Sequence, residues 1–157
     1  MKTIYIGADH GGFLLKEKIT KWLVEKKIPF VDSGNIVYDK NDDYPDYALK
    51  VASLVVQNKS KGILCCASAE GVCIAANKVR GIRAVNPASV IQTTFSRAHE
   101  DANVLCLAGG GSRKRQPAVA FSLATKMIMT FLETPFSGAK RHIRRLNKIK
   151  KIERMRL

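Results

Sequence analysis

The chain has 157 residues, of which 46% are hydrophobic and 25% are charged, and its formal net charge is +14. These values are ordinary for a globular protein and sufficient for one core, so we expect a single domain over residues 1–157. No apolar run approaches the roughly 18–20 residues of a membrane span, which argues against a membrane protein. A strand-like run begins at once, without a signal peptide, and predicts a cytoplasmic location.

Basic residues crowd the C-terminal segment 140–157, where they outnumber the acidic ones heavily. Such a pattern favours anionic partners, which include sugar phosphates, nucleic acid and acidic surfaces. No aromatic stacking platform or RNA motif accompanies it, so nucleic acid is not the expected partner.

Strand and helix patterns alternate along the chain. In order, we expect a strand at 3–8, a helix at 13–26, a strand at 29–34, a helix at 47–58 opened by Pro45, a strand at 62–66, a helix at 72–78, a strand at 82–85, a helix at 89–99, a strand at 103–108, and helices at 118–133 and 141–154. Short β-rich runs separated by helices predict a five-stranded parallel sheet with helices on both faces. The last helix carries an apolar stripe that we expect to pack on a partner subunit.

The segment 62–78, GILCCASAEGVCIAANK, is the most informative part of the chain. An apolar strand ends at Cys66, a loop of small residues follows, and a helix begins. A helix N-terminus offers free N–H groups and a partial positive charge, which favour anions and lower the pKa of a nearby thiol. Cys66 is therefore a candidate base, whereas its neighbour Cys65 should point to the opposite face of the sheet. The four cysteines contain no CxxC pair, so we expect reduced thiols and neither a disulfide framework nor a metal site.

Ligands bind beyond the carboxyl ends of strands in such sheets. Candidate polar residues follow this rule, because Asp9 and His10 come after the first strand, Cys66 ends the third, and Arg113 comes after the fifth.

Several motifs together resemble the type B ribose-5-phosphate isomerases, which are grouped with the galactose-6-phosphate isomerases. They are DHGGFLLK at 9–16, DYPDYA at 43–48, GILCC at 62–66, IAANK at 74–78, GIRA at 81–84, SRAHEDANVL at 96–105 and FSGAKRHIRR at 136–145. The resemblance implies a Rossmann-like three-layer α/β/α fold and a homodimer, or a tetramer, with active sites at the subunit interface. It also implies interconversion of ribose 5-phosphate and ribulose 5-phosphate through a cis-enediolate, without metal or organic cofactor.

The resemblance also implies the site. Its catalytic residues are Cys66, Ser68, His99 and Asp9, and its substrate-binding residues are His10, Tyr44, Ala67, Ala69, Glu70, Gly71, Glu100, Arg113, Arg141 and Arg145. Cys66 would move a proton between C1 and C2, and His99 would open the furanose ring with help from Asp9.

The remaining implied roles concern binding. The Ser68 hydroxyl would bond the reacting oxygens, and the N–H groups of 67–71 would hold the enediolate. Tyr44 would line the sugar pocket. The phosphate would be bound by His10, Arg141 and Arg145, with Arg113 as a further candidate, and His142 is an ordinary surface histidine or a support for these arginines.

The loop after Cys66 departs from the family pattern of Gly-Thr-Gly followed by a small apolar residue and Gly. Ala67 and Ala69 would be strained wherever the backbone needs positive φ. Glu70 would repel an enediolate and raise the pKa of the base, unless it points to solvent or pairs with a lysine or arginine. Glu100 replaces an asparagine, and the loop AGGGSRKRQ at 108–116 is long. These departures leave two alternatives open: an isomerase of allose 6-phosphate or galactose 6-phosphate, and an impaired relative that binds a polyanion through its basic C-terminal helix.

Overall fold

The computed structural model describes residues 2–111 and 118–155. Its strands are β1 (Ile4–Ala8), β2 (Phe30–Asp32), β3 (Gly62–Cys66), β4 (Ala84–Val85) and β5 (Val104–Ala108). They form a parallel sheet in the order β2-β1-β3-β5-β4, which confirms the predicted fold class. The helices are α1 (Phe13–Glu25), α2 (Tyr44–Asn58), α3 (Glu70–Ala76), α4 (Val90–Ala98), α5 (Phe121–Glu133) and α6 (Lys140–Ile152).

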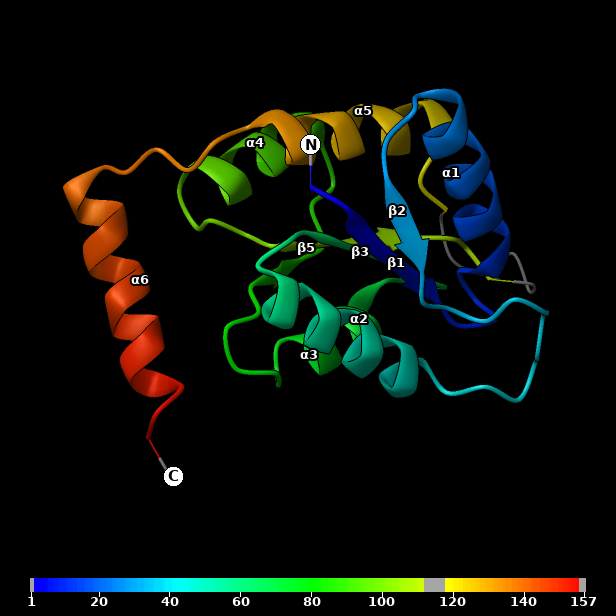
Figure 1. The fold of residues 1–157 in the computed structure, drawn as a ribbon, viewed down its shortest axis with the longest axis horizontal. Coiled ribbons are helices and arrows are strands. Elements are labelled where there is room, and N and C mark those ends of the chain that lie inside the picture. Colours follow the sequence, from blue (N-terminus) through cyan, green and yellow to red (C-terminus); the bar gives the residue numbers. More distant parts are fainter. Residues whose placement is uncertain (1, 112–117, 156–157) are drawn as a thin grey trace.

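Helices cover both faces of the sheet (Figure 1). α1 and α5 pack on one face, with α4 against α5, while α2 and α3 pack on the other. The central strand β3 is buried throughout, and its side chains alternate between the two cores. Cys65 belongs to the core under α1 and α5 and Cys66 to the core under α2 and α3, so the predicted opposite orientation of the two thiols is confirmed.

Two helices begin earlier than the sequence pattern suggests. α2 starts at Tyr44, so that Pro45 lies in its first turn, where a missing N–H costs nothing. α3 starts at Glu70, directly after Ala69 in a left-handed conformation. Both shifts bring predicted site residues into the first turn of a helix.

α6 stands apart from the sheet at the left of Figure 1, joined to α5 by an extended segment. Leu146 of its apolar stripe is buried, while Ile143 and Ile149 remain 44% and 39% exposed. Packing of this stripe on a partner subunit stays a prediction. In the described part of the chain, no helix has the length and apolar character that crossing a membrane requires.

Candidate active site

The carboxyl edge of the sheet brings Cys66 and Asp9 together. β1 and β3 are paired neighbours, with Ala8 opposite Cys65, so the residues that follow on each strand meet at the same edge. The Cys66 Sγ donates a hydrogen bond to Asp9 Oδ2 at 3.1 Å. Both side chains are nearly inaccessible to solvent, at 7% and 4% exposure. The arrangement is a buried thiol paired with a carboxylate.

This pairing reverses one sequence-based expectation. Burial, and after it the hydrogen bond and negative charge of Asp9, raise the pKa of Cys66 to about 12. The N–H groups of Ala67 and Ala69 act in the opposite direction, as a helix start should, but they are outweighed. The helix start thus acts in the predicted direction, but the expected net lowering of the pKa is wrong for the free chain, in which Cys66 is a thiol. A thiol that acts as a base must first give its proton to a neighbour.

The residues after Cys66 that depart from the family pattern differ in how well they fit the backbone of the loop. Ala69 has φ of 67°, a left-handed conformation that strains any residue with a Cβ, whereas Ala67 is not among the positive-φ residues. Glu70 is exposed, and its Oε1 accepts a hydrogen bond from Asn86 Nδ2 at 3.1 Å. Glu70 thus partners an amide, not the lysine or arginine considered from sequence. The Ser68 Oγ accepts the Glu70 N–H at 3.3 Å and keeps its own proton to donate.

His10 and Tyr44 border the same edge. His10 is partly exposed, and its Nδ1 lies 2.6 Å from Asp42 Oδ1. The Tyr44 ring lies directly over the start of α3, because a Cβ added to Gly71 would come within 2.8 Å of it. Glycine at position 71 therefore lets the tyrosine approach the loop that follows Cys66.

A second group of predicted residues lies at the opposite edge. α4 runs back across the sheet, so its C-cap His99 ends near the amino ends of the strands. The His99 ring packs on those of Phe95 and His142, with centroids 5.0 and 4.3 Å away. Glu100 lies beside it, and its carbonyl accepts a hydrogen bond from Arg83. One chain therefore does not unite His99 with Cys66.

Arg141 and Arg145 belong to this second group, because α6 begins next to His99. The intervening His142 is buried, not on the surface; its Nδ1 lies 2.7 Å from Ser137 Oγ, and Arg141 Nε donates to its Nε2 at 3.1 Å. Burial, then the charges of His99 and the two arginines, lower the pKa of His142. The alternative that His142 supports its arginine neighbours is the one the structure favours. Arg113 lies outside the described residues.

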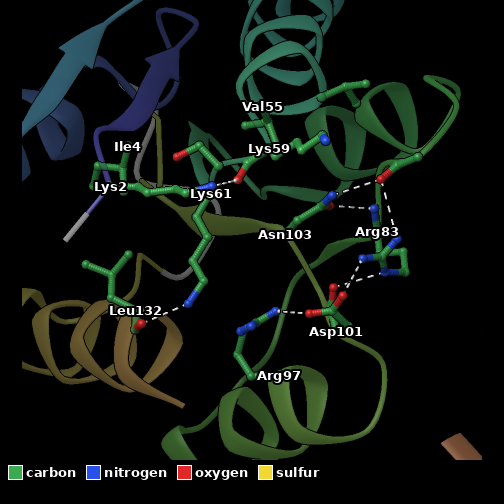
Figure 2. Close-up of a pocket in the computed structure, with 13 residues that line it drawn as sticks. Lys2, Ile4, Val55, Lys59, Lys61, Arg83, Arg97, Asp101, Asn103 and Leu132 are labelled. Atoms are coloured by element: carbon green, nitrogen blue, oxygen red, sulfur yellow. Dashed lines mark hydrogen bonds and ion pairs between the residues drawn. The ribbon is translucent and has the colours of Figure 1, made fainter. Parts of the chain in front are cut away.

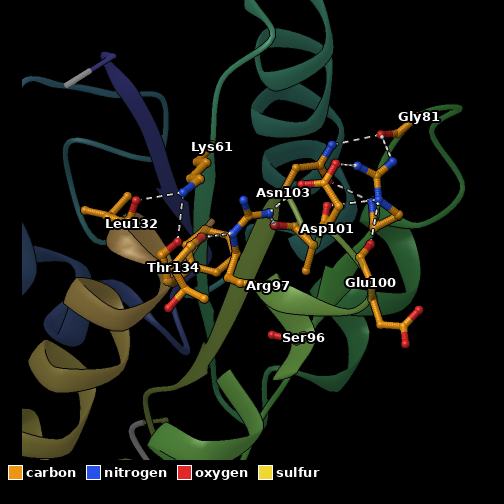
Figure 3. A network of polar contacts seen from close by, with 12 residues as sticks. Lys61, Gly81, Ser96, Arg97, Glu100, Asp101, Asn103, Leu132 and Thr134 are labelled. Carbon is orange, nitrogen blue, oxygen red and sulfur yellow. Dashed lines mark hydrogen bonds and ion pairs between the residues drawn. The ribbon is translucent and has the colours of Figure 1, made fainter. Parts of the chain in front are cut away.

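The amino edge also holds a cavity of about 610 Å³ (Figure 2). Three of the cations that line it already bind protein groups. Arg83 and Arg97 share Asp101, each at 2.9 Å, and Lys61 Nζ donates to the carbonyls of Phe131 and Leu132 at 2.9 and 2.8 Å (Figure 3). This network ties the starts of β3 and β5 to the ends of α4 and α5. It is a structural feature of the fold and lies away from the thiol.

Comparison with known proteins decides the family. The sequence pattern of the Ribose/Galactose Isomerase family matches residues 4–149. The chain belongs to this family. It is 42% identical to the probable ribose-5-phosphate isomerase B of Mycoplasma genitalium, over 96% of this chain and 95% of that protein, and 39% identical to the ribose-5-phosphate isomerase B of Escherichia coli, over 99% of each.

Solved structures of the family agree with the fold. The crystal structure of ribose-5-phosphate isomerase B from Mycoplasma genitalium with bound ribulose-5-phosphate has a TM-score of 0.88 and 40% identity, covering 98% of this chain and 97% of that one. The enzyme from Clostridium thermocellum gives 0.86 and 39%, covering 97% of each. The resemblance drawn from the motifs is confirmed.

Sequence reasoning missed the polar residues that support this candidate site from outside its motifs. Asp42 and Asn86 bind His10 and Glu70 respectively, and the N–H groups of Gly109 and Gly110 bind the carbonyls of Cys66 and Ala67 at 2.7 and 2.9 Å. The run of three glycines was a signal, because only glycine lets the loop after β5 approach so closely: a Cβ on Gly109 would lie 2.8 Å from a backbone oxygen. Asp42 sits in a polar turn and carries no such signal.

Proposed function

We propose that this chain is an aldose–ketose isomerase that interconverts ribose 5-phosphate and ribulose 5-phosphate. The observation that carries the proposal is the buried Cys66–Asp9 pair at the carboxyl edge of the sheet, 3.1 Å apart, in a chain of this family. The reaction belongs to carbohydrate metabolism, in the non-oxidative branch of the pentose phosphate pathway. We place it in the cytoplasm.

The pair supplies a base that can serve both carbons. When the substrate binds, the Cys66 thiol gives its proton to Asp9, and the resulting thiolate removes the proton from C2 of the open-chain aldose. The C2–H electron pair moves into the C1–C2 double bond of a cis-enediolate, whose negative oxygen is stabilised by nearby N–H groups. The thiol then delivers the proton to C1, the oxygens exchange a proton to yield the ketose, and Asp9 returns its proton to the Cys66 thiolate. No electrons leave the substrate, so no cofactor is required.

Ring opening and phosphate binding need groups that the same chain holds at its opposite edge. We therefore propose a homodimer in which His99, Arg141 and Arg145 of the partner subunit complete the site around Cys66. Two observations support this arrangement: the partly exposed apolar stripe of α6, which a partner would cover, and the exposed arginines beside it. A two-fold dimer forms two such sites at once.

Phosphate recognition would then combine His10 with the partner's Arg141 and Arg145. The guanidinium fork binds two phosphate oxygens together, which suits it to this task. Tyr44, placed over Gly71, would close one side of the sugar pocket.

A turnover assay tests the proposal. Purified protein is supplied with ribose 5-phosphate and, separately, with allose 6-phosphate and galactose 6-phosphate, beside Cys66→Ala as the base variant and Cys65→Ala as the matched control on the opposite face. We expect turnover of ribose 5-phosphate that is lost in Cys66→Ala. Turnover that survives Cys66→Ala would rule out the proposed base, and a preference for a hexose phosphate would change the substrate.

A further inference from the structure

Asp42 is a buried carboxylate that the loop before α2 folds onto His10. Its side chain is 6% exposed, and one oxygen, Oδ1, contacts both the His10 backbone N–H at 2.9 Å and the His10 Nδ1 at 2.6 Å. The other oxygen, Oδ2, accepts from Asn35 Nδ2 at 2.8 Å. The Tyr47 phenol faces the same carboxylate. The carboxylate is thus held in place from several sides.

These contacts determine which nitrogen of His10 carries a proton. A carboxylate only accepts hydrogen bonds, so Nδ1 is the protonated nitrogen and donates to Asp42. The ring rotation is fixed by the same bond and by the edge-on Tyr38 ring, whose centroid is 6.4 Å away. Nε2 is left for a ligand, on a side chain that remains 36% exposed.

The charge of His10 is set by its acidic neighbours. The hydrogen bond from His10 to Asp42 raises the pKa of His10, and the charge of Asp9 acts in the same direction against partial burial. The groups that face the ring are Asp9 after β1, Tyr38 in the loop after β2, and Asp42 before α2. Protonation turns Nε2 from an acceptor into a donor with a positive charge, which is the form that binds a phosphate.

We propose that Asp42 is a positioning residue that holds His10 as a cationic donor, with Nε2–H directed at the phosphate group of the substrate. The inference rests on the proposed function, in which His10 binds that phosphate. Asp42 itself does not touch the substrate. It acts through His10, in the way that an orienting carboxylate fixes the tautomer of a working histidine.

Three side chains around the ring lie close enough together to be candidate metal ligands: Asp9, His10 and Asp42 each have one ligand atom within 4.8 Å of the others. The hydrogen bond between His10 and Asp42 accounts for this approach, because it places a proton where a metal would need a lone pair. The three side chains therefore form a proton-bearing cluster.

The test compares wild type with Asp42→Asn, which keeps the size and an acceptor oxygen but removes the charge. The His10 imidazole is titrated by NMR, with His10→Asn used to assign its resonance, and the affinity for inorganic phosphate is measured across the same pH range. We expect the pKa of His10 to fall by about 1 pH unit in Asp42→Asn, and phosphate binding above that pKa to weaken about tenfold. Asp39→Asn, which removes an exposed charge from the same loop, should change neither.

A double variant separates positioning from simple structural support. In the His10→Asn background, Asp42→Asn should weaken phosphate binding no further, because the route through His10 is already gone. With ribose 5-phosphate, Asp42→Asn should raise KM with rising pH and leave kcat little changed.

An unchanged His10 pKa in Asp42→Asn, or an equal loss of phosphate affinity in the His10→Asn background, would overturn the proposal. Titration and phosphate binding need no turnover. If both change as expected in a protein that isomerises no pentose phosphate, the role of Asp42 is supported and only the proposed function is contradicted.

Discussion

At the scale of single residues, the proposed mechanism depends on a proton passed between Cys66 and Asp9. Burial raises the pKa of the Cys66 thiol most, and the Asp9 carboxylate raises it further by stabilising the neutral thiol, yet Asp9 is also the acceptor 3.1 Å from the sulfur. A base with so high a pKa is strong once it is ionised. Asp9 is therefore expected to be necessary for activity even though it disfavours the thiolate.

Replacing Asp9 separates these two effects. In Asp9→Asn the hydrogen bond to a charged oxygen and the negative field are lost, so we expect the pKa of Cys66 to fall below that of wild type while isomerisation falls by about 100-fold or more. The pKa is read from the pH dependence of Cys66 alkylation, quantified by mass spectrometry. A Cys66 pKa that stays the same or rises would show that burial alone sets it.

The strained Ala69 gives a prediction about stability. At φ of 67° the Cβ of alanine is unfavourable, so Ala69→Gly should stabilise the folded chain by about 1 kcal/mol. Ala67→Gly is the matched control, because Ala67 has no positive φ, so glycine there relieves no strain, adds freedom to the unfolded chain and removes a packed methyl group. Urea denaturation compares the stability of the two variants. Stabilisation by both changes, or by neither, would contradict the assignment of backbone strain to Ala69 alone.

At the scale of elements, most of the fold could be predicted from the sequence. Each expected strand and helix is present, because short β-rich runs and helical stripes bury their apolar faces against one another. Several boundaries moved. α2 and α3 start earlier than expected, at Tyr44 and Glu70, in polar segments that carry no periodicity, while α5 starts later, at Phe121. β2 and β4 are shorter than expected, at 30–32 and 84–85.

The site was less predictable, for physical reasons that differ between residues. Motif order placed Cys66, Asp9 and His10 at one edge correctly. The predicted pKa shift of Cys66 had the wrong direction because burial, which raises the pKa, depends on tertiary packing. Asp42 was not recognised because only the folded loop brings it to His10. The separation of His99 from Cys66 follows from the direction in which α4 returns across the sheet.

Lys61 connects the start of β3 to the end of α5 and makes stability depend on pH. Burial, then the charge of Arg97, lowers its pKa from 10.5 to about 8. Between these values the folded chain has lost the proton that the unfolded chain still binds, so the free energy of unfolding rises with pH across this window.

The Lys61→Met variant isolates this contribution. Relative to the variant, wild type should gain about 1–2 kcal/mol between pH 8 and 10.5, after allowance for the partial exposure of the amine. Denaturation curves of both proteins at several pH values give the difference between their free energies of unfolding. Taking this difference cancels the titration of groups that the two proteins share. A difference that does not change with pH would mean that Lys61 keeps its ordinary pKa.

At the scale of the whole molecule, the two groups of site residues lie at opposite edges of one sheet. Cys66, Asp9 and His10 occupy the carboxyl edge, while His99 and Arg141 lie where α4 ends and α6 begins. In the proposed mechanism, ring opening and proton transfer act on one sugar, so the two groups would have to cooperate across copies of the chain. We therefore propose that the active site is shared between two subunits.

Subunit complementation tests that claim most directly. Cys66→Ala and His99→Asn, each nearly inactive alone, are co-expressed with different tags, and the mixed dimer is purified and assayed with ribose 5-phosphate. One of its two sites then combines an intact Cys66 with an intact His99, so the mixed dimer should show about half of wild-type activity per dimer, and a randomly assembled population about a quarter. A purified mixed dimer no more active than either parent would contradict a site built from two subunits.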